Sequence, residues 1–372
     1  MMEQIQILIK PASSACDLRC RYCFYRDEAS HRKEGNLGKM EPQVMEAIIE
    51  KGLSCAQNVV FAFQGGEPTL AGLEFFRTFA KTVEEKRKNG QKVSYTIQTN
   101  GYGIDDEWIS FFRKNRFLVG VSLDGVRKTH DENRLSSDGS GTFEKVFENI
   151  KKMQKQQVDM NVLCVLNRQT AEKIEAIYRF FMRKGLYYQQ YIPCLDPLDR
   201  ERGKENYSLP PKLYADALKR LFDLWFEDKR AGNLVYIRQF DNYLHVLRGG
   251  TPEACTMYGK CSMQNVVEAD GSVYPCDFYA LDTYRMGNIK ETDFAALQEQ
   301  ASREEEGTFF ENPARRDDRC PSCRWYPLCR GGCKRDCEEQ AGTVRNYYCE
   351  VYTEFFEYAI GRLEWLAKNR YV

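Results

Sequence analysis

The chain has 372 residues, 42% of them hydrophobic, and is therefore long enough to form one large core or two domains of ordinary size. Lys and Arg together number 54, as do Asp and Glu, so net charge gives no reason to expect nucleic acid or an anionic membrane as a partner. The start, "MMEQIQILIK", lacks the features of a signal peptide, and no stretch reaches the roughly 18 apolar residues of a spanning helix. We therefore expect a cytoplasmic protein.

The predicted elements alternate over the first part of the chain. Short apolar runs predict six strands, at residues 6–9, 59–63, 94–98, 117–122, 160–166 and 187–192. Helical patterns lie between them, and such alternation predicts a parallel sheet with right-handed crossovers. The alternation stops after Lys229. We therefore predict an α/β fold, a partial (β/α)6 TIM-like barrel over residues 1–233, followed by a second, cysteine-rich domain over residues 234–372. The last apolar pattern, "YTEFFEYAIGRLEWL", predicts a packed terminal helix.

The chain contains fifteen cysteines, and their number calls for a chemical role. Disulfides need an oxidising compartment, which nothing in the sequence indicates, and the count is odd. Cys55, Cys164 and Cys194 lie in or beside apolar runs and are predicted to be small buried residues. The other cysteines fall into two groups, one near the start and one between Cys255 and Cys349, and these favour metal or iron–sulfur ligation.

Polar motifs follow the predicted strands. They are the three-cysteine loop that begins at Cys16, "QGGEP" at 64–68, "QTNG" at 98–101, "SLDG" at 122–125, "NR" at 167–168 and "PCLDP" at 193–197. Each one alone is compatible with an ordinary turn. Because the carboxyl ends of parallel strands meet on one face, where barrel enzymes assemble their sites, the motifs together predict an active site.

The first cysteine group carries a specific resemblance. The spacing Cys16-x3-Cys20-x2-Cys23, with "QGGEP" after the second strand, resembles the radical S-adenosylmethionine superfamily. The resemblance implies that three thiolates hold three irons of a 4Fe–4S cluster and that the fourth iron is open to S-adenosylmethionine. The alternative is a structural zinc site completed by His31.

The same resemblance implies further contacts with S-adenosylmethionine. Gly66 lets backbone approach the methionyl amino group, and Ser122 and Arg134 donate hydrogen bonds to its carboxylate and ribose. The backbone of Tyr22 and the region of Leu195 resemble positions that hold adenine. For Arg134 a solvated surface charge is the alternative.

The second cysteine group resembles the SPASM domain of peptide-modifying radical enzymes. Its order is Cys261-x9-Gly271-x4-Cys276, then Cys320-x2-Cys323-x5-Cys329-x3-Cys333, then Cys349. With Cys255 as an eighth thiol, the family pattern implies two saturated 4Fe–4S clusters. One is held by Cys255, Cys261, Cys276 and Cys333, and the other by Cys320, Cys323, Cys329 and Cys349. Cys337 is left over and is predicted to be a spare thiol; its place four residues after Cys333 leaves the alternative that it is a ligand in place of another cysteine. Two zinc sites satisfy the same ligand count.

A narrower resemblance covers nearly the whole chain. "IKPASSACDLRCRYCFY", "FAFQGGEPTLAGLEFF", "CLDPL" and "DGSVYPCDFY" resemble the anaerobic sulfatase-maturating enzymes. The resemblance implies oxidation of a Cys or Ser, in a Cys/Ser-x-Pro-x-Arg segment of an unfolded or nascent sulfatase, to Cα-formylglycine. It also implies S-adenosylmethionine and three 4Fe–4S clusters as cofactors, an electron donor such as flavodoxin or ferredoxin, and action as a monomer. Neither a Cys nor a Ser preference nor the particular sulfatase is visible in the sequence.

The implied reaction assigns a role to Asp277. A 5′-deoxyadenosyl radical removes a hydrogen from Cβ of the target, a base takes the thiol or hydroxyl proton, and an auxiliary cluster accepts the remaining electron. A Cys target then carries a thioaldehyde, which water hydrolyses to the aldehyde, whereas a Ser target gives the aldehyde directly. Asp277 follows Cys276 and matches the family position of that base. Without the resemblance, a turn aspartate that caps backbone amides explains "PCDFY" equally well.

Two other functions remain open at this point. Another SPASM maturase would form a thioether or carbon–carbon crosslink in a small peptide, although no separate peptide-recognition domain precedes "IQILIKPASS". A metal-binding or electron-carrying protein without chemistry of its own would need the cysteines but not the "QGGEP" motif. Cleavage of S-adenosylmethionine distinguishes the carrier from either enzyme.

Overall fold

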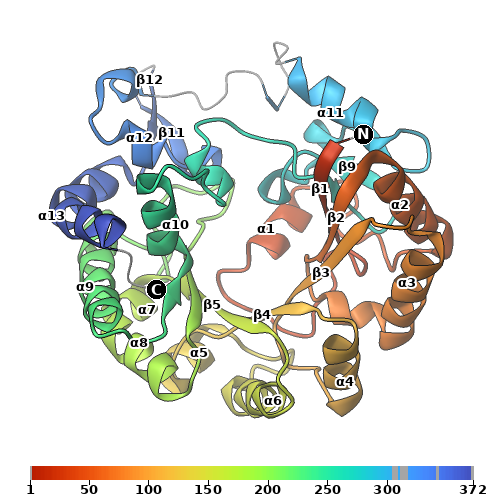
Figure 1. Cartoon of the computed structure of the whole chain (residues 1–372), viewed down its shortest axis with the longest axis horizontal. Helices are drawn as coiled ribbons and strands as arrows, with labels where there is room; N and C mark the ends of the chain where they lie inside the picture. Colours follow the sequence, from red (N-terminus) through yellow and green to blue (C-terminus); the bar gives the residue numbers. More distant parts are fainter. Residues whose placement is uncertain (1, 304–308, 311–316, 341–342, 370–372) are drawn as a thin grey trace. The chain divides into compact units, whose positions relative to one another are not determined.

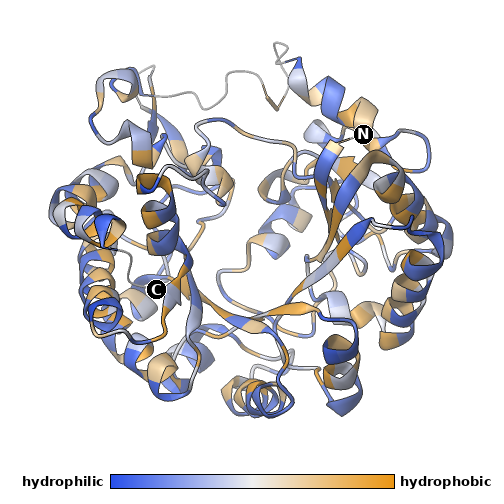
Figure 2. Cartoon of the chain, viewed as in Figure 1, coloured by the Kyte–Doolittle hydropathy of each residue, from blue (hydrophilic) through white to orange (hydrophobic). Residues whose placement is uncertain are grey.

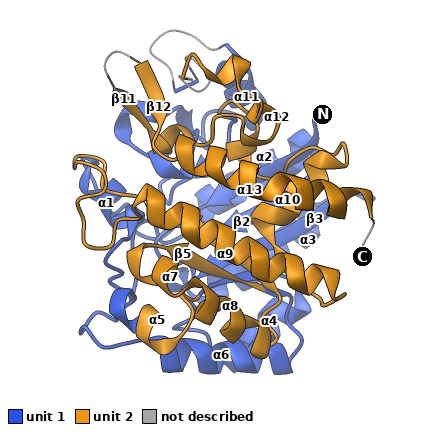
Figure 3. Ribbon diagram, turned by 90° about the vertical axis from the view of Figure 1, so that its left-hand side faces the viewer, with its two compact units in different colours: residues 1–122, 131–160, 262–310 blue, residues 123–130, 161–261, 311–372 orange. Residues whose placement is uncertain are grey.

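The computed structural model describes residues 2–303, 309–310, 317–340 and 343–369, and Figure 1 shows its elements in chain order. The chain forms two compact units (Figure 3). Unit 1 comprises residues 1–122, 131–160 and 262–310, and unit 2 comprises residues 123–130, 161–261 and 311–372. Helix α5 (Arg127–Asn133) contains one of the boundaries between them. Within the described ranges, no helix combines the length and the apolar character that crossing a membrane requires.

Unit 1 is built on a mostly parallel sheet. Its strands run in the order β10-β9-β8-β1-β2-β3-β4. The pairs β1–β2, β2–β3, β3–β4 and β1–β8 are parallel, and β8–β9 and β9–β10 are antiparallel. The strands are β1 (Met2–Ile9), β2 (Ala56–Phe63), β3 (Lys92–Thr99), β4 (Leu118–Ser122), β8 (Val266–Val267), β9 (Ser272–Tyr274) and β10 (Gly287–Asn288).

The helices of unit 1 are α1 (Phe24–Ser30), α2 (Pro42–Cys55), α3 (Leu73–Lys86), α4 (Asp106–Lys114), α6 (Phe143–Lys155) and α11 (Phe294–Ser302). All except α1 bury apolar side chains in the core, whereas the buried side chain of α1 is that of Glu28. Figure 2 shows that hydrophobic and hydrophilic residues alternate along these helices. In α2, for example, Met45, Ile48, Ile49 and Leu53 recur at helical spacing and are all buried. Burial of this stripe, more than intrinsic propensity, fixes the helix in place.

Unit 2 continues the alternation of strands and helices. Strand β6 pairs in parallel with both β5 and β7. The elements are β5 (Met160–Leu166), α7 (Arg168–Glu172), α8 (Ile174–Arg183), β6 (Tyr188–Pro193), α9 (Pro211–Arg230), β7 (Tyr236–Ile237), α10 (Arg238–Leu247), α12 (Tyr326–Cys329), β11 (Cys337–Gln340), β12 (Thr343–Asn346) and α13 (Cys349–Lys368).

The terminal helix α13 packs inside unit 2. Phe355 and Phe356 are fully buried, and the Phe355 ring stacks on Phe240 of α10 with ring centroids 5.6 Å apart. Phe222 of α9 meets Phe355 edge-on, also at 5.6 Å. These contacts confirm the predicted packed helix, because the aromatic stripe is used inside the unit.

The predicted fold class is confirmed, and each of the six predicted strands is present within a few residues of its predicted bounds. Among the described residues, neither strand group closes into a full barrel. The prediction that alternation ends after Lys229 is wrong, because β7 and α10 follow it. Strands β7 to β10 have only two or three residues, which is too short for a strand period to show. The compact units do not follow the predicted boundary at residue 233, and that division into domains stays a prediction.

Candidate functional site

The three-cysteine loop lies between β1 and α1 of unit 1. Its backbone pairs with a distant segment, because Arg19 N donates to Leu135 O at 2.7 Å and Arg21 N to Asn133 O at 3.0 Å. Cys23 directly precedes α1. The thiols of Cys16, Cys20 and Cys23 are half-buried, so the loop holds three potential ligands in a fixed and partly shielded backbone.

The surroundings of these thiols suit a bound cation. Cys16 Sγ accepts from Leu18 N at 3.4 Å and from Asn100 Nδ2 at 3.7 Å. Burial raises the pKa of Cys16 and of Cys23 above that of a free thiol. A thiolate in such a place needs compensating positive charge, which a metal cluster provides.

The "QGGEP" motif packs directly on this loop. Gly66 has a φ of +52°. A Cβ on Gly66 would lie 2.8 Å from Ser13 O and closer still to Ala15 O, while the next residue, Glu67, donates its N–H to Ala15 O at 2.7 Å. Only glycine combines this backbone conformation with such a close approach. The motif therefore serves here to join the end of β2 to the cysteine loop.

Glu67 connects the motif to the next strand. Its buried carboxylate accepts hydrogen bonds from Thr99 Oγ1 at 2.9 Å and from Asn100 N at 2.7 Å, both at the end of β3. It also accepts from Thr69 N at 3.1 Å. Burial raises the pKa of this carboxyl group, and the hydrogen bonds act in the opposite direction. The ends of β2 and β3 are thus fixed to each other around one buried side chain.

Three of the residues predicted to bind S-adenosylmethionine, Tyr22, Ser122 and Arg134, are buried, whereas Gly66 and Leu195 are half-buried. Arg134 is 6% exposed, its guanidinium lies 5.5 Å from the centre of the Tyr22 ring, and Nη1 lies 4.0 Å from Cys20 Sγ. The alternative of a solvated charge is therefore wrong for Arg134. Ser122 is also buried, and its hydroxyl accepts from Gln98 Nε2 at 3.3 Å. Leu195 differs from the other four in belonging to unit 2.

Asp277 lies in unit 1 at the start of the short helix η3 (Asp277–Tyr279) and is 4% exposed. Its Oδ2 accepts from Tyr25 Oη at 2.6 Å and from Gln64 Nε2 at 2.9 Å. Its Oδ1 has no hydrogen-bond partner among the described residues, although Lys10 Nζ lies 3.4 Å away. The described hydrogen bonds to the carboxylate come from side chains, whereas an aspartate that caps a turn would accept from backbone amides.

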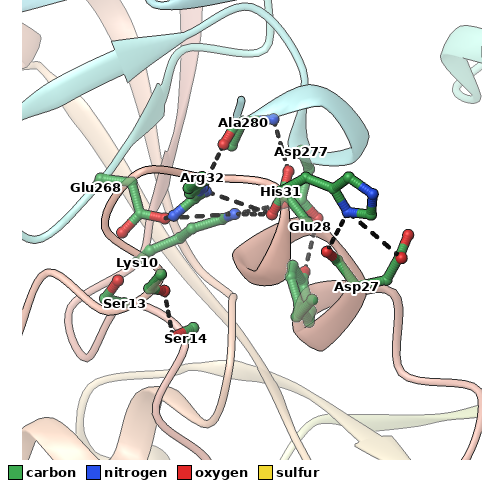
Figure 4. Close-up of polar contacts among 12 residues, drawn as sticks. Lys10, Ser13, Ser14, Asp27, Glu28, His31, Arg32, Glu268, Asp277 and Ala280 are labelled. Carbon is green, nitrogen blue, oxygen red and sulfur yellow. Dashed lines mark hydrogen bonds and ion pairs between the residues drawn. The ribbon is translucent and has the colours of Figure 1, made fainter. Parts of the chain in front are cut away.

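Asp277 belongs to an ionic cluster, which we define as Lys10, Glu28, Arg32, Glu268 and Asp277 (Figure 4). Lys10 is the member that faces Asp277, and the others pair with Lys10 or with one another. All five are at most 9% exposed. Burial alone would lower the pKa of Lys10, but Glu28, Asp277 and Glu268 together raise it. Burial followed by the charge of Asp277 raises the pKa of Tyr25 well above its ordinary value, so the phenol is a neutral donor.

Unit 2 brings together the four cysteines of the second predicted auxiliary cluster. Burial and then the neighbouring thiols of Cys349, Cys320 and Cys323 raise the pKa of Cys329 to about 12. The thiol of Cys337, which is not assigned to either cluster, donates from Sγ to Cys333 O at 3.4 Å. That bond fits the prediction of a spare thiol.

The four cysteines predicted to hold the first auxiliary cluster do not all belong to one unit. Cys276 belongs to unit 1, whereas Cys255, Cys261 and Cys333 belong to unit 2. Cys333 Sγ accepts from Arg335 N at 3.3 Å. None of these four thiols is buried.

Cys55, Cys164 and Cys194 are predicted to be small buried residues, and His31 is the fourth ligand of the zinc alternative. Cys164 and Cys194 are buried as predicted, while Cys55 is only half-buried at the end of α2. His31 Nδ1 lies 2.8 Å from Asp27 O (Figure 4), so this ring nitrogen faces its own helix. This contact gives the zinc alternative no support.

Sequence reasoning missed most of the side chains around Asp277. Gln64 lay inside a quoted motif, as did Lys10 and Tyr25, but none received a role. Glu28, Arg32 and Glu268 had no local signal, because charged residues usually face solvent. Two of their contacts, Arg32 with Glu268 and Glu28 with Ala280, join positions more than 230 residues apart in the chain.

Comparison with known proteins agrees with this arrangement. The model of the radical SAM superfamily matches residues 11–181, and that of the SPASM iron–sulfur cluster-binding domain matches residues 255–333. The cysteine-type anaerobic sulfatase-maturating enzyme of Clostridium novyi (strain NT) is 44% identical over 371 residues, which cover 99% of this chain and 98% of that protein. The chain belongs to the anaerobic sulfatase-maturating enzyme family. It is a radical SAM enzyme, and both predictions are confirmed.

More distant and structural relatives agree with the family. The serine-type enzyme of Bacteroides thetaiotaomicron is 29% identical over 386 residues, covering 98% of this chain and 92% of that protein. A structure of native anSMEcpe with bound AdoMet and Cp18Cys peptide has a TM-score of 0.91 and 42% identity, and the match covers 99% of both chains. Streptococcus suis SuiB bound to S-adenosylmethionine, at 18% identity and a TM-score of 0.62, shares the fold; the match covers 94% of this chain and 77% of that one.

The contact at Gly66 generates the first prediction. Gly66→Ala should abolish cleavage of S-adenosylmethionine, because the new methyl group would push the 13–15 backbone, and with it the cysteine loop, out of place. Gly90→Ala is the matched control, since Gly90 also has positive φ but no atom of the described residues lies within 4 Å of the point that a Cβ would occupy. It should lose only about 1–2 kcal/mol of stability. Equal losses of cleavage in the two variants would contradict the role given to Gly66.

Proposed function

We propose that this enzyme oxidises a cysteine in a sulfatase peptide to Cα-formylglycine. The observation that carries the proposal is the 44% identity, over nearly the full length of both chains, to a cysteine-type anaerobic sulfatase-maturating enzyme. The lower identity, 29%, to a serine-type relative favours cysteine over serine as the target residue. Turnover of a Cys-type and a Ser-type Cys/Ser-x-Pro-x-Arg peptide, followed by mass spectrometry, tests this preference.

The described residues fit the cofactors of this reaction. The half-buried thiols of Cys16, Cys20 and Cys23 would hold the first cluster, and Gly66, Ser122, Arg134, the Tyr22 backbone and the Leu195 region would bind S-adenosylmethionine. When bound, this pair supplies the 5′-deoxyadenosyl radical that removes a hydrogen from Cβ of the target. Two further sets of four thiols would hold the auxiliary clusters: Cys255, Cys261, Cys276 and Cys333, and Cys320, Cys323, Cys329 and Cys349.

Asp277 is proposed to take the thiol proton of the target cysteine. Tyr25 and Gln64 both donate to Oδ2, which leaves Oδ1 available as the accepting atom. Lys10 balances part of the carboxylate charge at 3.4 Å without a hydrogen bond. A base held from two sides keeps one geometry and needs little reorganisation during the reaction.

The electron donor and the oligomeric state remain predictions. A small electron carrier such as flavodoxin or ferredoxin would supply the reducing electron, and we expect the enzyme to work as a monomer in the cytoplasm. A crosslinking maturase is the competing function within the superfamily. It would be favoured if a Cys-x-Pro-x-Arg peptide emerged with a thioether and without an aldehyde.

Iron content tests the cluster assignment. The anaerobically reconstituted chain should contain about twelve irons, from three four-iron clusters. Changing Cys16, Cys20 and Cys23 together to Ala should leave about eight and abolish cleavage of S-adenosylmethionine. Iron and zinc are measured on the same preparation, and zinc in place of iron would overturn the assignment.

Cys329 and Cys337 provide a matched pair in unit 2. Cys329→Ala should lose the four irons of one cluster, lower the melting temperature and reduce aldehyde formation, because a saturated metal site stabilises the domain that contains it. Cys337→Ala removes a half-buried thiol that donates to Cys333 O, and it should keep all the iron. Iron loss in the Cys337 variant would show that its thiol had been misassigned.

Asp277→Asn tests the base directly. The change preserves size but removes the basic carboxylate, and loss of a positioned base typically reduces a rate about 10²- to 10⁴-fold. The variant should keep its iron and still produce 5′-deoxyadenosine, yet yield little aldehyde. Iron, 5′-deoxyadenosine and aldehyde peptide are measured together, and normal aldehyde per iron would end the case for Asp277.

A further inference from the structure

Two side chains that have no direct part in the proposed reaction connect helix α1 to the segment that carries Asp277. Glu28 and Arg32 lie four residues apart at the end of α1 and just beyond it. Both contact the backbone of Ala280, three residues after Asp277. Figure 4 shows the two side chains converging on it from the same side.

The contacts use both polar groups of one residue. Ala280 N donates to Glu28 Oε1 at 2.6 Å, and Ala280 O accepts from Arg32 Nε. Ala280 is fully buried, so water cannot replace either bond. The helix η3 spans only Asp277–Tyr279, and three residues of 3₁₀-helix have little stability of their own. Its position therefore depends on these outside contacts.

Arg32 makes several contacts at once. In addition to Ala280 O, Nη1 donates to Glu268 Oε1 at 2.7 Å, and Nη2 lies 3.4 Å from Glu28 Oε2. Glu268 follows β8 directly, so one guanidinium joins α1, the end of β8 and the end of η3. The planar fork of arginine allows three fixed directions, which the single ammonium of lysine does not provide.

We propose that Glu28 and Arg32 are positioning residues that hold Asp277 in its working place through the backbone of Ala280. The proposal rests on the proposed function, because the two residues would ensure that loss of the Cβ hydrogen from the target cysteine is followed by loss of its thiol proton to Asp277. Glu28 also accepts from Lys10 Nζ at 3.0 Å, and the same ammonium faces Asp277 at 3.4 Å. The pair thus acts on Asp277 both through backbone and through Lys10.

The test compares Arg32→Lys with wild type in the reconstituted holoenzyme. Arg32→Lys keeps the positive charge but loses the planar guanidinium that contacts Ala280 O, Glu268 and Glu28 at once. Iron content and production of 5′-deoxyadenosine should stay near wild type, while aldehyde per 5′-deoxyadenosine should fall roughly ten- to a hundredfold, as expected when a reacting group shifts by about 1 Å. Amide hydrogen exchange over residues 277–284 should become faster, and this readout does not depend on turnover.

Gln91→Met is the matched control in the same unit. Gln91 is 4% exposed and donates from Nε2 to Leu53 O at 2.6 Å and to Ala56 O at 2.7 Å, at the opposite ends of the strands. Loss of these two hydrogen bonds in Gln91→Met should lower the melting temperature but leave the ratio of aldehyde to 5′-deoxyadenosine unchanged. If it lowers the ratio as much as Arg32→Lys does, the effect is general destabilisation and the proposal is wrong.

A second variant keeps the test decisive if Arg32→Lys does not fold. Glu28→Gln retains an oxygen for Ala280 N but loses the charge that attracts Arg32 and Lys10, and it should lower the same ratio. The proposal would be overturned if the folded variant had the same ratio of aldehyde to 5′-deoxyadenosine as wild type and the same rate of amide hydrogen exchange over residues 277–284. If wild type itself makes no aldehyde, the proposed function fails, and the exchange of residues 277–284 alone then decides whether the pair holds this segment.

Discussion

Parallel pairing of β1 to β4 determines where the candidate site residues of unit 1 lie. Strands that run in one direction end at one edge of the sheet, so the segments that follow them must meet there. The cysteine loop follows β1, Gly66 and Glu67 follow β2, Asn100 follows β3 and Ser122 ends β4. The observed contacts agree, since Glu67 N reaches Ala15 O and the Glu67 carboxylate reaches Asn100 N. The common direction of the strands in the sheet is therefore enough to bring these residues together, without a bound metal.

Those features of the fold that depend on local pattern could be predicted from the sequence. The strands β1 to β6 have five to eight residues each, long enough for an apolar run to be visible. Strands β8 to β10 have two or three residues and are formed by pairing with β1 and with each other. Nothing in "NVVEADGSVYP" distinguishes a strand added to the edge of β1 from an ordinary hairpin. Tertiary pairing, rather than propensity, made these strands.

The same division applies to the site. Cysteine spacing and "QGGEP" are local and could be recognised, and so could Asp277 through its neighbour Cys276. The role of Glu28 could not be predicted, because its partners Lys10 and Ala280 are 18 and 252 residues away. A glutamate in "YRDEASHRK" is indistinguishable from any exposed helix residue. Arg134 was ambiguous for the same reason, and its burial followed only from the pairing of the 133–136 segment with the cysteine loop.

The ionic cluster also raises the question of why five charged groups are buried where apolar side chains would pack at lower cost. A buried ion pair rarely adds net stability, because desolvation of the charges offsets their attraction. It does, however, impose a geometry, since each charge must keep its partners and hydrogen bonds to remain inside the protein. In this unit those partners are a helix that begins directly after Cys23 and a segment that begins directly after Cys276. Apolar contacts such as Phe24 against Phe278, with centroids 5.0 Å apart, hold the same two segments together but tolerate sliding. The directional bonds of Glu28 and Arg32 to Ala280 do not. The role proposed for Asp277, proton removal from a residue that also loses a hydrogen, requires fixed distances, and the directional bonds of Glu28 and Arg32 would supply them at the expense of stability.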